Sequence, residues 1–210
     1  MTHLVLLGDS VFDNAPYVAQ GQEVIEQLRR RLPSDWQATL LARDGAVLAG
    51  VREQAGRVPG DSTHLFVSAG GNDALGWTGI FGERVANVAQ ALVRLGEIRS
   101  EFRERYRTML DGVLRLGRPT AICTIYDVRY PDPAYREIAV VALTVLNDII
   151  SREAARRGLP LLDLRVLLDE DADFANPIEP SAQGGAKLAR AVLAVVEGEG
   201  STVLGRLPPA

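Results

Sequence analysis

Cysteine, histidine and long apolar runs are scarce in this chain of 210 residues. Cys123 is the only cysteine, so no disulfide can form within the chain, and its apolar neighbours predict a buried, inert thiol. The longest apolar stretch, residues 138–150, is interrupted by polar side chains and is too short to span a bilayer. The formal net charge is −4, and the arginines are scattered among acids. We therefore expect neither a membrane nor a nucleic acid among the partners of this protein.

Motifs for cofactors and metals are also missing from the sequence. No Gly-x-Gly-x-x-Gly fingerprint follows the first apolar run, which weakens a dinucleotide-binding interpretation. The acidic run 169–173 lacks the glycine and the spaced glutamate of an EF-hand, so we expect a solvated loop there. No secretory signal is recognisable, because the residues after Met1 are needed for the first strand. These observations predict a cytoplasmic protein that uses neither a metal ion nor a cofactor.

The chain does contain a regular alternation of short apolar runs and longer helical patterns. Compact apolar runs are typical of strands covered on both faces, and they lie at residues 3–7, 37–42, 64–68, 120–125 and 159–162. Helical patterns lie between them at 21–32, 46–58, 82–116, 133–157 and 181–197. The third pattern is so long that we expect a break near Gly96. The alternation predicts an α/β protein, a three-layer α/β/α sandwich with a five-stranded parallel sheet in the flavodoxin-like order 2-1-3-4-5.

One domain is expected over residues 1–197, because no repeat and no change of composition divides this stretch. The tail at 198–210 is rich in glycine and proline, which is typical of a loosely ordered end. Its apolar residues Val203, Leu204 and Leu207 would alternatively suit docking on a second copy of the chain, as in a homo-oligomer.

Polar segments follow the first three predicted strands. Ser10 ends the tripeptide Gly8-Asp9-Ser10 after the first strand, Gly45 follows the second, and Asn72 follows the third. The carboxyl ends of parallel strands are where such sheets bind ligands, so we expect these segments to meet. A serine at a strand-to-helix turn can present its hydroxyl as a nucleophile. The backbone N–H groups of Ser10 and Gly45 and the Asn72 amide would then form an oxyanion hole.

On these residues the chain resembles the SGNH, or GDSL, hydrolase family. Gly8-Asp9-Ser10 matches the first sequence block of the family, with Ser10 in the nucleophile position. Gly45 matches the glycine of the second block, and Gly70-x-Asn72-Asp73 matches the third. Pro180-Ser181 and the helical pattern after it match the frame of the last block. The resemblance covers nearly the whole chain, and it implies the three-layer fold and hydrolysis of esters, thioesters or carbohydrate O-acyl groups without a metal.

The last block departs from the family where its members carry Asp-x-x-His. Asn176 stands in place of the aspartate, and Glu179 stands in place of the histidine. The only two histidines, His3 and His64, begin predicted strands and therefore lie at the opposite edge of the sheet from the site. At about 3.3 Å per residue, His3 is on the order of 20 Å from Ser10. Neither histidine is therefore expected to act as the base.

Glu179 can act as the base if burial raises its pKa. An ordinary glutamate is about two pKa units less basic than histidine, which corresponds to roughly 3 kcal/mol. Burial would recover part of this deficit by destabilising the charged form. Asn176 would supply a neutral amide that orients Glu179, and Arg165, after the last predicted strand, would screen its charge.

Several further residues are candidates for contact with a small-molecule ester substrate. These are the polar residues Asp9, Asn14, Asp73 and Arg165 and the aromatic residues Trp77 and Phe81. A purely structural role is the alternative for each, because turns and helix starts use Asp and Asn, and apolar loops pack on the core.

Three interpretations of function remain open at this point. The first is an atypical serine esterase in which Ser10 attacks, Glu179 accepts its proton, and Asn176 orients Glu179. The second is a catalytically impaired binding module for an acylated or sugar-like ligand. The third is a subunit that receives its missing base from a partner chain.

Overall fold

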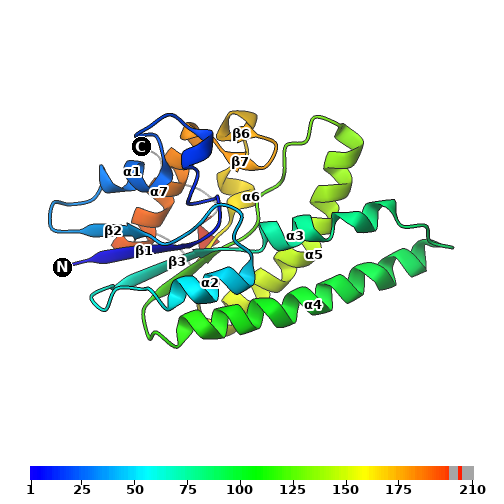
Figure 1. The fold of residues 1–210 in the computed structure, drawn as a ribbon, viewed down its shortest axis with the longest axis horizontal. Helices are drawn as coiled ribbons and strands as arrows, with labels where there is room; N and C mark the ends of the chain where they lie inside the picture. Colours follow the sequence, from blue (N-terminus) through cyan, green and yellow to red (C-terminus); the bar gives the residue numbers. More distant parts are fainter. Residues whose placement is uncertain (199–202, 205–210) are drawn as a thin grey trace.

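The computed structural model describes residues 1–198 and the backbone of residues 203–204. Its central sheet is parallel throughout, and five strands follow the predicted order β2-β1-β3-β4-β5 (Figure 1). The short strand β8 (Val203–Leu204) continues the sheet beside β5. Leu207 lies outside the described residues. The five strands are β1 (His3–Gly8), β2 (Gln37–Leu40), β3 (His64–Ser68), β4 (Thr120–Cys123) and β5 (Leu161–Leu162).

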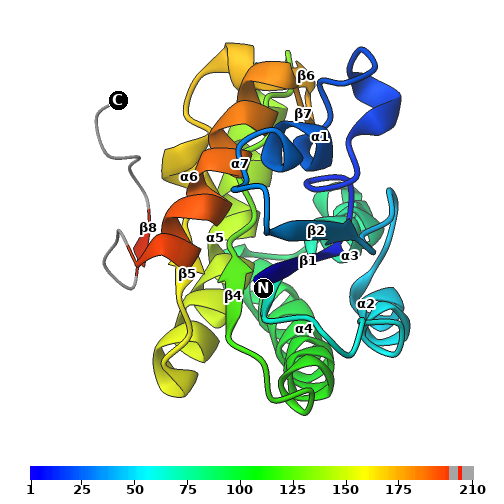
Figure 2. The same cartoon turned by 90° about the vertical axis from the view of Figure 1, so that its left-hand side faces the viewer.

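Helices cover both faces of the sheet, because alternate residues of the strands point to opposite sides. Val5 and Leu7 of β1 pack into a core formed with α2 (Leu48–Ala55), α4 (Val88–Leu114) and α5 (Pro133–Arg157). Leu4 and Leu6 face the opposite core, which contains α1 (Val24–Arg29), α6 (Leu164–Leu167) and α7 (Ala182–Glu197). Figure 2 shows α1 and α7 on one side of β1 and β2, with α2 and α4 on the other.

Short elements surround the carboxyl edge of the sheet. They are the helix α3 (Gly71–Gly76), the 3-10 turns η1 (Ala15–Tyr17), η2 (Thr78–Gly82) and η3 (Asp171–Asp173), and the antiparallel pair β6 (Phe174–Asn176) and β7 (Glu179–Pro180). No helix within residues 1–198 is long and apolar enough to cross a bilayer.

The expected break near Gly96 is wrong, because α4 runs without interruption over 27 residues. One glycine in a helix interior costs only about 1 kcal/mol relative to alanine. The carboxyl-terminal half of α4 supplies far more than this through its buried residues Phe102, Tyr106, Met109, Leu110 and Val113. The predicted strands 37–42 and 120–125 also end early, because the chain leaves the sheet there to form the loops of the site.

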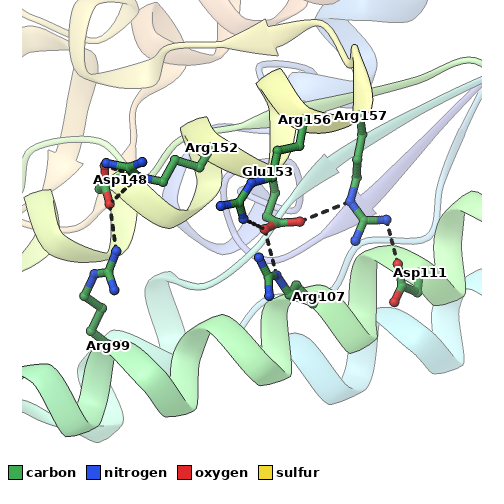
Figure 3. Close-up of polar contacts among 8 residues, drawn as sticks. All are labelled: Arg99, Arg107, Asp111, Asp148, Arg152, Glu153, Arg156 and Arg157. Carbon is green, nitrogen blue, oxygen red and sulfur yellow. Dashed lines mark hydrogen bonds and ion pairs between the residues drawn. The ribbon is translucent and has the colours of Figure 1, made fainter.

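A buried carboxylate joins α4 to α5. Glu153 on α5 accepts hydrogen bonds from Arg107 Nε at 2.7 Å, Arg156 Nη1 at 2.9 Å and Arg157 Nε at 3.2 Å (Figure 3). Burial raises the pKa of Glu153, but the three guanidinium hydrogen bonds outweigh burial and leave the pKa below its ordinary value. These contacts fix the relative position of two helices that form a wall of the site described below.

Glu153→Gln should lower the free energy of unfolding by about 1–3 kcal/mol, because a buried charge-assisted network loses its acceptor. Because the folded-state pKa of Glu153 is lowered, its contribution is present above the unfolded pKa and is lost as the pH falls through the folded pKa. Urea denaturation at neutral and acidic pH measures both effects.

Asp148→Asn is the matched control, since Asp148 of α5 accepts from Arg99 of α4 and Arg152 of α5, but its side chain is 39% exposed (Figure 3). It should cost less than about 1 kcal/mol. An equal decrease in the free energy of unfolding of the two variants would show that burial does not strengthen the contribution of Glu153 to stability.

Candidate active site

The turn that carries Ser10 begins with a glycine that no other residue can replace. Gly8 ends β1 with φ of 131°, and a Cβ on it would lie 1.8 Å from the carbonyl oxygen of Ser68 on β3. The buried Gln54 side chain of α2 holds Gly8 from the other side, accepting from its N–H at 2.7 Å and donating to its carbonyl at 2.8 Å. Phe12 N then donates to Asp9 O at 3.2 Å, which closes the turn. Ser10 therefore lies at the carboxyl end of β1, and it is buried.

Ser10 faces the carboxyl group of Glu179, which is itself only 7% exposed. Burial raises the pKa of Glu179, the hydrogen-bonding contact with Ser10 lowers it, and the net effect leaves the pKa above its ordinary value. The Oε2 atom of Glu179 is buried without a hydrogen-bond partner among the described residues. A carboxylate with raised basicity and a free oxygen beside a serine hydroxyl is chemically able to accept a proton.

The β6–β7 hairpin holds Glu179 in this position, and α7 anchors the hairpin. Gly184 in the first turn of α7 allows the backbone of Asp173 to approach, since a Cβ there would lie 2.3 Å from the Asp173 carbonyl oxygen. Ser181 N donates to the same carbonyl at 2.8 Å. Lys187 Nζ contacts the buried Asp173 carboxylate at 2.7 Å. The family-like frame of the last block therefore fixes where Glu179 sits.

A second buried carboxyl group lies next to Ser10. Burial raises the pKa of Asp9 to about 7, and the negative charge of Glu179 adds to this effect. Hydrogen bonds from Val11 N at 3.2 Å and Ser68 Oγ at 3.4 Å to Asp9 Oδ1 oppose the rise without cancelling it. Near neutral pH a substantial fraction of Asp9 is therefore protonated, which limits the negative charge beside Ser10.

The three candidate oxyanion donors lie on loops that contact one another. Asn72, in the first turn of α3, donates one amide hydrogen to Ala46 O at 3.0 Å and keeps a second hydrogen. The loop containing Gly45 is tied to the serine turn by Arg43 N, which donates to Gly8 O at 3.0 Å. Within residues 1–198, the backbone N–H groups of Ser10 and Gly45 donate no hydrogen bond to another protein group. Gly45 borders a neighbouring polar groove rather than the cavity beside Ser10.

A mostly apolar cavity of about 90 Å³ adjoins Ser10. Its polar lining includes Asp9, Ser10, Asn72 and Glu179. Among the predicted substrate-contacting residues, Trp77 and Phe81 also line it. Its remaining walls come mainly from α3, α4, α5 and the loop between β4 and α5, and include Leu75, Leu95, Ile98, Tyr130, Tyr135, Leu143 and Leu146. The helical spacing of the apolar α4 residues is typical of a core-facing stripe, and nothing in that spacing distinguishes a core from a cavity wall.

Asn14 and Asp73 lie outside the cavity lining and hold backbone segments together. Asn14 is fully buried; its Nδ2 donates to Pro180 O at 3.2 Å, and its Oδ1 accepts from Val24 N at 2.9 Å. Asp73 accepts from Leu48 N at 2.9 Å, which fixes the start of α2. Both contacts correspond to the structural alternative considered from the sequence.

Arg165 and Asn176 also lie outside the cavity lining. The Arg165 guanidinium pairs with Asp163 through contacts of 2.7 and 2.5 Å. Asn176 Oδ1 accepts from Ile178 N at 2.9 Å and so orders the turn of the hairpin. Asn176 is paired with Glu179 through the strand register. Among the described residues, no hydrogen bond joins the Asn176 amide to the Glu179 carboxyl group.

Both histidines lie at the amino ends of their strands, as predicted. His3 Nε2 contacts Thr39 Oγ1 at 2.8 Å, and His64 Nδ1 contacts Thr63 Oγ1 at 2.9 Å. Ser10 follows the other end of β1. Within residues 1–198, no group of three or more His, Cys, Asp or Glu side chains is arranged to hold a metal ion.

The sequence blocks and this geometry agree with a family comparison. The model of the GDSL-like lipase/acylhydrolase family matches residues 6–187, which is most of the chain. The chain belongs to this family. No curated protein matches it in sequence.

Several solved structures share the fold of this chain at low sequence identity. An extracellular lipase from Streptomyces rimosus is 17% identical, with a TM-score of 0.65 over 93% of this chain and 99% of the lipase. Phospholipase A1 from Streptomyces albidoflavus NA297 is 16% identical, with a TM-score of 0.66 over 95% and 99% of the two chains. A member of the lipolytic G-D-S-L family from Veillonella parvula DSM 2008 is 16% identical, with a TM-score of 0.66 over 94% and 99%. These similarities establish the α/β fold of the GDSL hydrolases for this chain.

Asp9→Asn should stabilise the protein increasingly as the pH rises. The folded-state pKa of Asp9 is about 7 against an ordinary 3.8, so the unfolded chain releases this proton first and the wild type loses stability between these two values. One pKa unit corresponds to about 1.36 kcal/mol. Between acid and neutral pH, the free energy of unfolding of Asp9→Asn should therefore rise by on the order of 4 kcal/mol relative to that of the wild type. Urea denaturation at a series of pH values measures this gain. A difference independent of pH would mean that Asp9 ionises normally in the folded protein.

Proposed function

We propose that this GDSL-family protein is an atypical serine esterase or acyl hydrolase that acts on a small ester. Ser10 is the nucleophile, and Glu179 replaces the usual histidine as general base. The observation that carries the proposal is the Ser10 hydroxyl facing a buried Glu179 carboxyl group. The pKa of this group is raised, and its Oε2 atom has no hydrogen-bond partner among the described residues. Family membership supports hydrolase chemistry at the same serine block.

Each proton transfer in the proposed reaction has a donor and an acceptor. Ser10 Oγ attacks the acyl carbon while Glu179 accepts the hydroxyl proton, and the carbonyl oxygen becomes an oxyanion. The N–H group of Ser10 and the Asn72 amide, which both border the cavity, stabilise that oxyanion. Protonated Glu179 donates to the leaving alcohol, and the acyl group remains on Ser10. A water molecule then attacks the acyl carbon while Glu179 accepts one of its protons. Protonated Glu179 returns that proton to Ser10 Oγ as the bond between Ser10 and the acyl group breaks, so the acid is released and both Ser10 and Glu179 are regenerated.

The cavity supports an ester with an apolar acyl group. Leu75, Trp77 and Phe81 lie among its mostly apolar walls, and Ser10 belongs to the same lining. An acyl chain bound there would place its carbonyl carbon beside Ser10 and leave the alcohol part toward the polar loops. The volume of about 90 Å³ favours a short acyl chain over a long one.

One observation favours a non-catalytic binding module as the second candidate. Asn176 Oδ1 accepts from Ile178 N, and within residues 1–198 no side chain orients the Glu179 carboxyl group by a hydrogen bond on the side away from Ser10. A base without an orienting partner performs poorly, since triad function depends on that third group. In this case the apolar cavity would bind an acylated ligand without turning it over.

A fluorophosphonate probe should label Ser10 in the wild type and give no adduct at this position in Ser10→Ala. Glu179→Gln keeps the shape of the side chain but removes the base, so the labelling rate should fall by about 10²–10⁴-fold. In the wild type the rate should rise as the pH increases through the raised pKa of Glu179, because only the carboxylate accepts a proton. Intact mass and peptide mapping locate the adduct, and circular dichroism confirms that each variant is folded. A folded wild type that remains unlabelled from about pH 5 to pH 9 would favour the binding module.

The double variant Asn176→Asp with Glu179→His places the family's Asp-x-x-His pair in the existing frame. If Ser10 and the oxyanion donors are competent, the more basic imidazole should raise turnover of a p-nitrophenyl ester near neutral pH by about tenfold or more. The same double variant carrying Ser10→Ala is the control and should remain inactive. No gain over wild type in a folded, Ser10-dependent variant would contradict the assignment of residue 179 as the base position.

A further inference from the structure

Exposed apolar side chains gather on the elements that line the cavity. Within residues 1–198, ten large hydrophobic side chains are exposed, and seven of them lie on or between α3, α4 and α5. This surface, here called the apolar rim, comprises Leu75, Val85, Val88, Leu92, Val93, Ile138 and Val141. Such a concentration is unusual on a free surface and marks a binding region.

The apolar rim is continuous with the cavity. Leu75 is 37% exposed and also lines the cavity, so it belongs to both surfaces. On α4, Leu92 is 63% exposed while Leu95, one helical turn later, lines the cavity. On α5, the exposed Val141 directly precedes the cavity-lining Ala142. A molecule with an apolar chain can therefore contact the rim and the cavity together.

The amino-terminal half of α4 projects from the body of the protein. The first fully buried residue of this helix is Phe102, and before it only Ile98 packs against the core within residues 88–101. Figure 1 shows this half extending beyond the sheet, on the side of the molecule where α3 and the first turns of α5 lie. Residues 85–93 contain no charged side chain. Residues 85–93 therefore form an uncharged, apolar ridge. This ridge can insert into a deformable interface without any rearrangement of the buried core.

Charges beside the apolar rim neutralise one another. Arg94 is paired with Glu83 through contacts of 2.9 and 3.0 Å, and it also contacts Glu97. No excess of positive charge marks this surface for anionic lipid headgroups. Adsorption there would therefore depend on apolar contact and would respond weakly to salt.

We propose that the apolar rim docks the protein on the surface of a neutral lipid aggregate, from which an amphiphilic ester enters the cavity beside Ser10. The occupant is the aggregate surface, because an amphiphile can cover the exposed rim and also extend an acyl chain into the cavity that Leu75 joins to it. A second copy seated on the rim would instead obstruct the cavity at Leu75. This inference rests on the proposed function for the fate of the ester, whereas surface adsorption is independent of catalysis. It departs from the expectation of no membrane partner, which was based on the lack of a spanning segment.

Adsorption is measured by co-sedimentation of the full chain with sucrose-loaded phosphatidylcholine vesicles, in the Ser10→Ala background so that no substrate is consumed. The test variant combines Val88→Gln, Leu92→Gln and Val93→Gln, because glutamine is polar but retains helix propensity. Val166→Gln is the matched control, since Val166 is equally an exposed valine but lies on α6 and does not line the cavity. The expected result is binding that the triple variant weakens by about tenfold or more and that the control leaves unchanged. Addition of phosphatidylglycerol or salt should change binding less than twofold.

Three results would overturn the proposal: no sedimentation of the folded protein, equal binding by the triple variant and its parent, or a dimer in light scattering that the triple variant converts to a monomer. The last would assign the rim to a second copy of the chain. Fluorophosphonate labelling of the Ser10-containing protein and of the triple variant with Ser10 retained is run in parallel. Labelling without adsorption would refute the surface alone, and adsorption without labelling would refute the proposed hydrolase while leaving the surface intact.

Discussion

The site depends on one close backbone approach between β1 and β3. At Gly8 the Ser68 carbonyl oxygen occupies the space where any other residue would place its Cβ, 1.8 Å away. The Gln54 side chain completes the clamp by bonding both the N–H and the carbonyl of Gly8. Three elements distant in sequence, β1, α2 and β3, therefore converge at the residue from which the serine turn departs. Neither Ser10 nor the Asp9 carboxyl group would hold its place without this convergence, because both follow Gly8 directly.

Much of the fold follows from the pattern of apolar residues. Each central strand is a short apolar run, and each long helix carries one apolar face, so the order of the five strands and the layers that cover them were predictable. The sixth strand β8 has only two residues, too few for a pattern to predict. Gly96 shows a second limit of prediction from sequence. The free-energy cost of one glycine in a helix is small compared with the stabilisation that α4 gains from its buried residues, so the helix continues through Gly96. The β6–β7 hairpin was not predicted as such, although the matched frame around Pro180 and Ser181 located its end.

The site was predictable where a residue type is demanded by chemistry and its position by a strand end. Ser10 and Asn72 met beside one cavity for this reason, and the histidines were excluded by the same topology. Glu179 was located instead by the resemblance of the last sequence block to the family. Side chains with several possible partners were harder to place. Asn14 and Asp73 follow the same strand ends, but their hydrogen bonds bind distant backbone groups that only the folded chain brings near. The cavity walls on α4 and α5 had no distinguishing signal, because a residue lining a cavity and a residue filling a core share the same helical face.

A carboxylate base changes the electrostatics of the whole reaction. A histidine base starts neutral and becomes a cation, which then attracts the oxyanion formed beside it. Glu179 would start as an anion and become neutral, so the oxyanion would gain no attraction from its base. Stabilisation would have to come from the dipoles of the Ser10 N–H group and the Asn72 amide, and any further negative charge would raise the barrier. Burial raises the pKa of Asp9 to about 7 and so reduces the negative charge of this residue near neutral pH. Asn176, which stands where family members carry an aspartate, has the same effect on the charge near Glu179. Both keep negative charge low around Glu179, and a carboxylate base in this fold requires that condition.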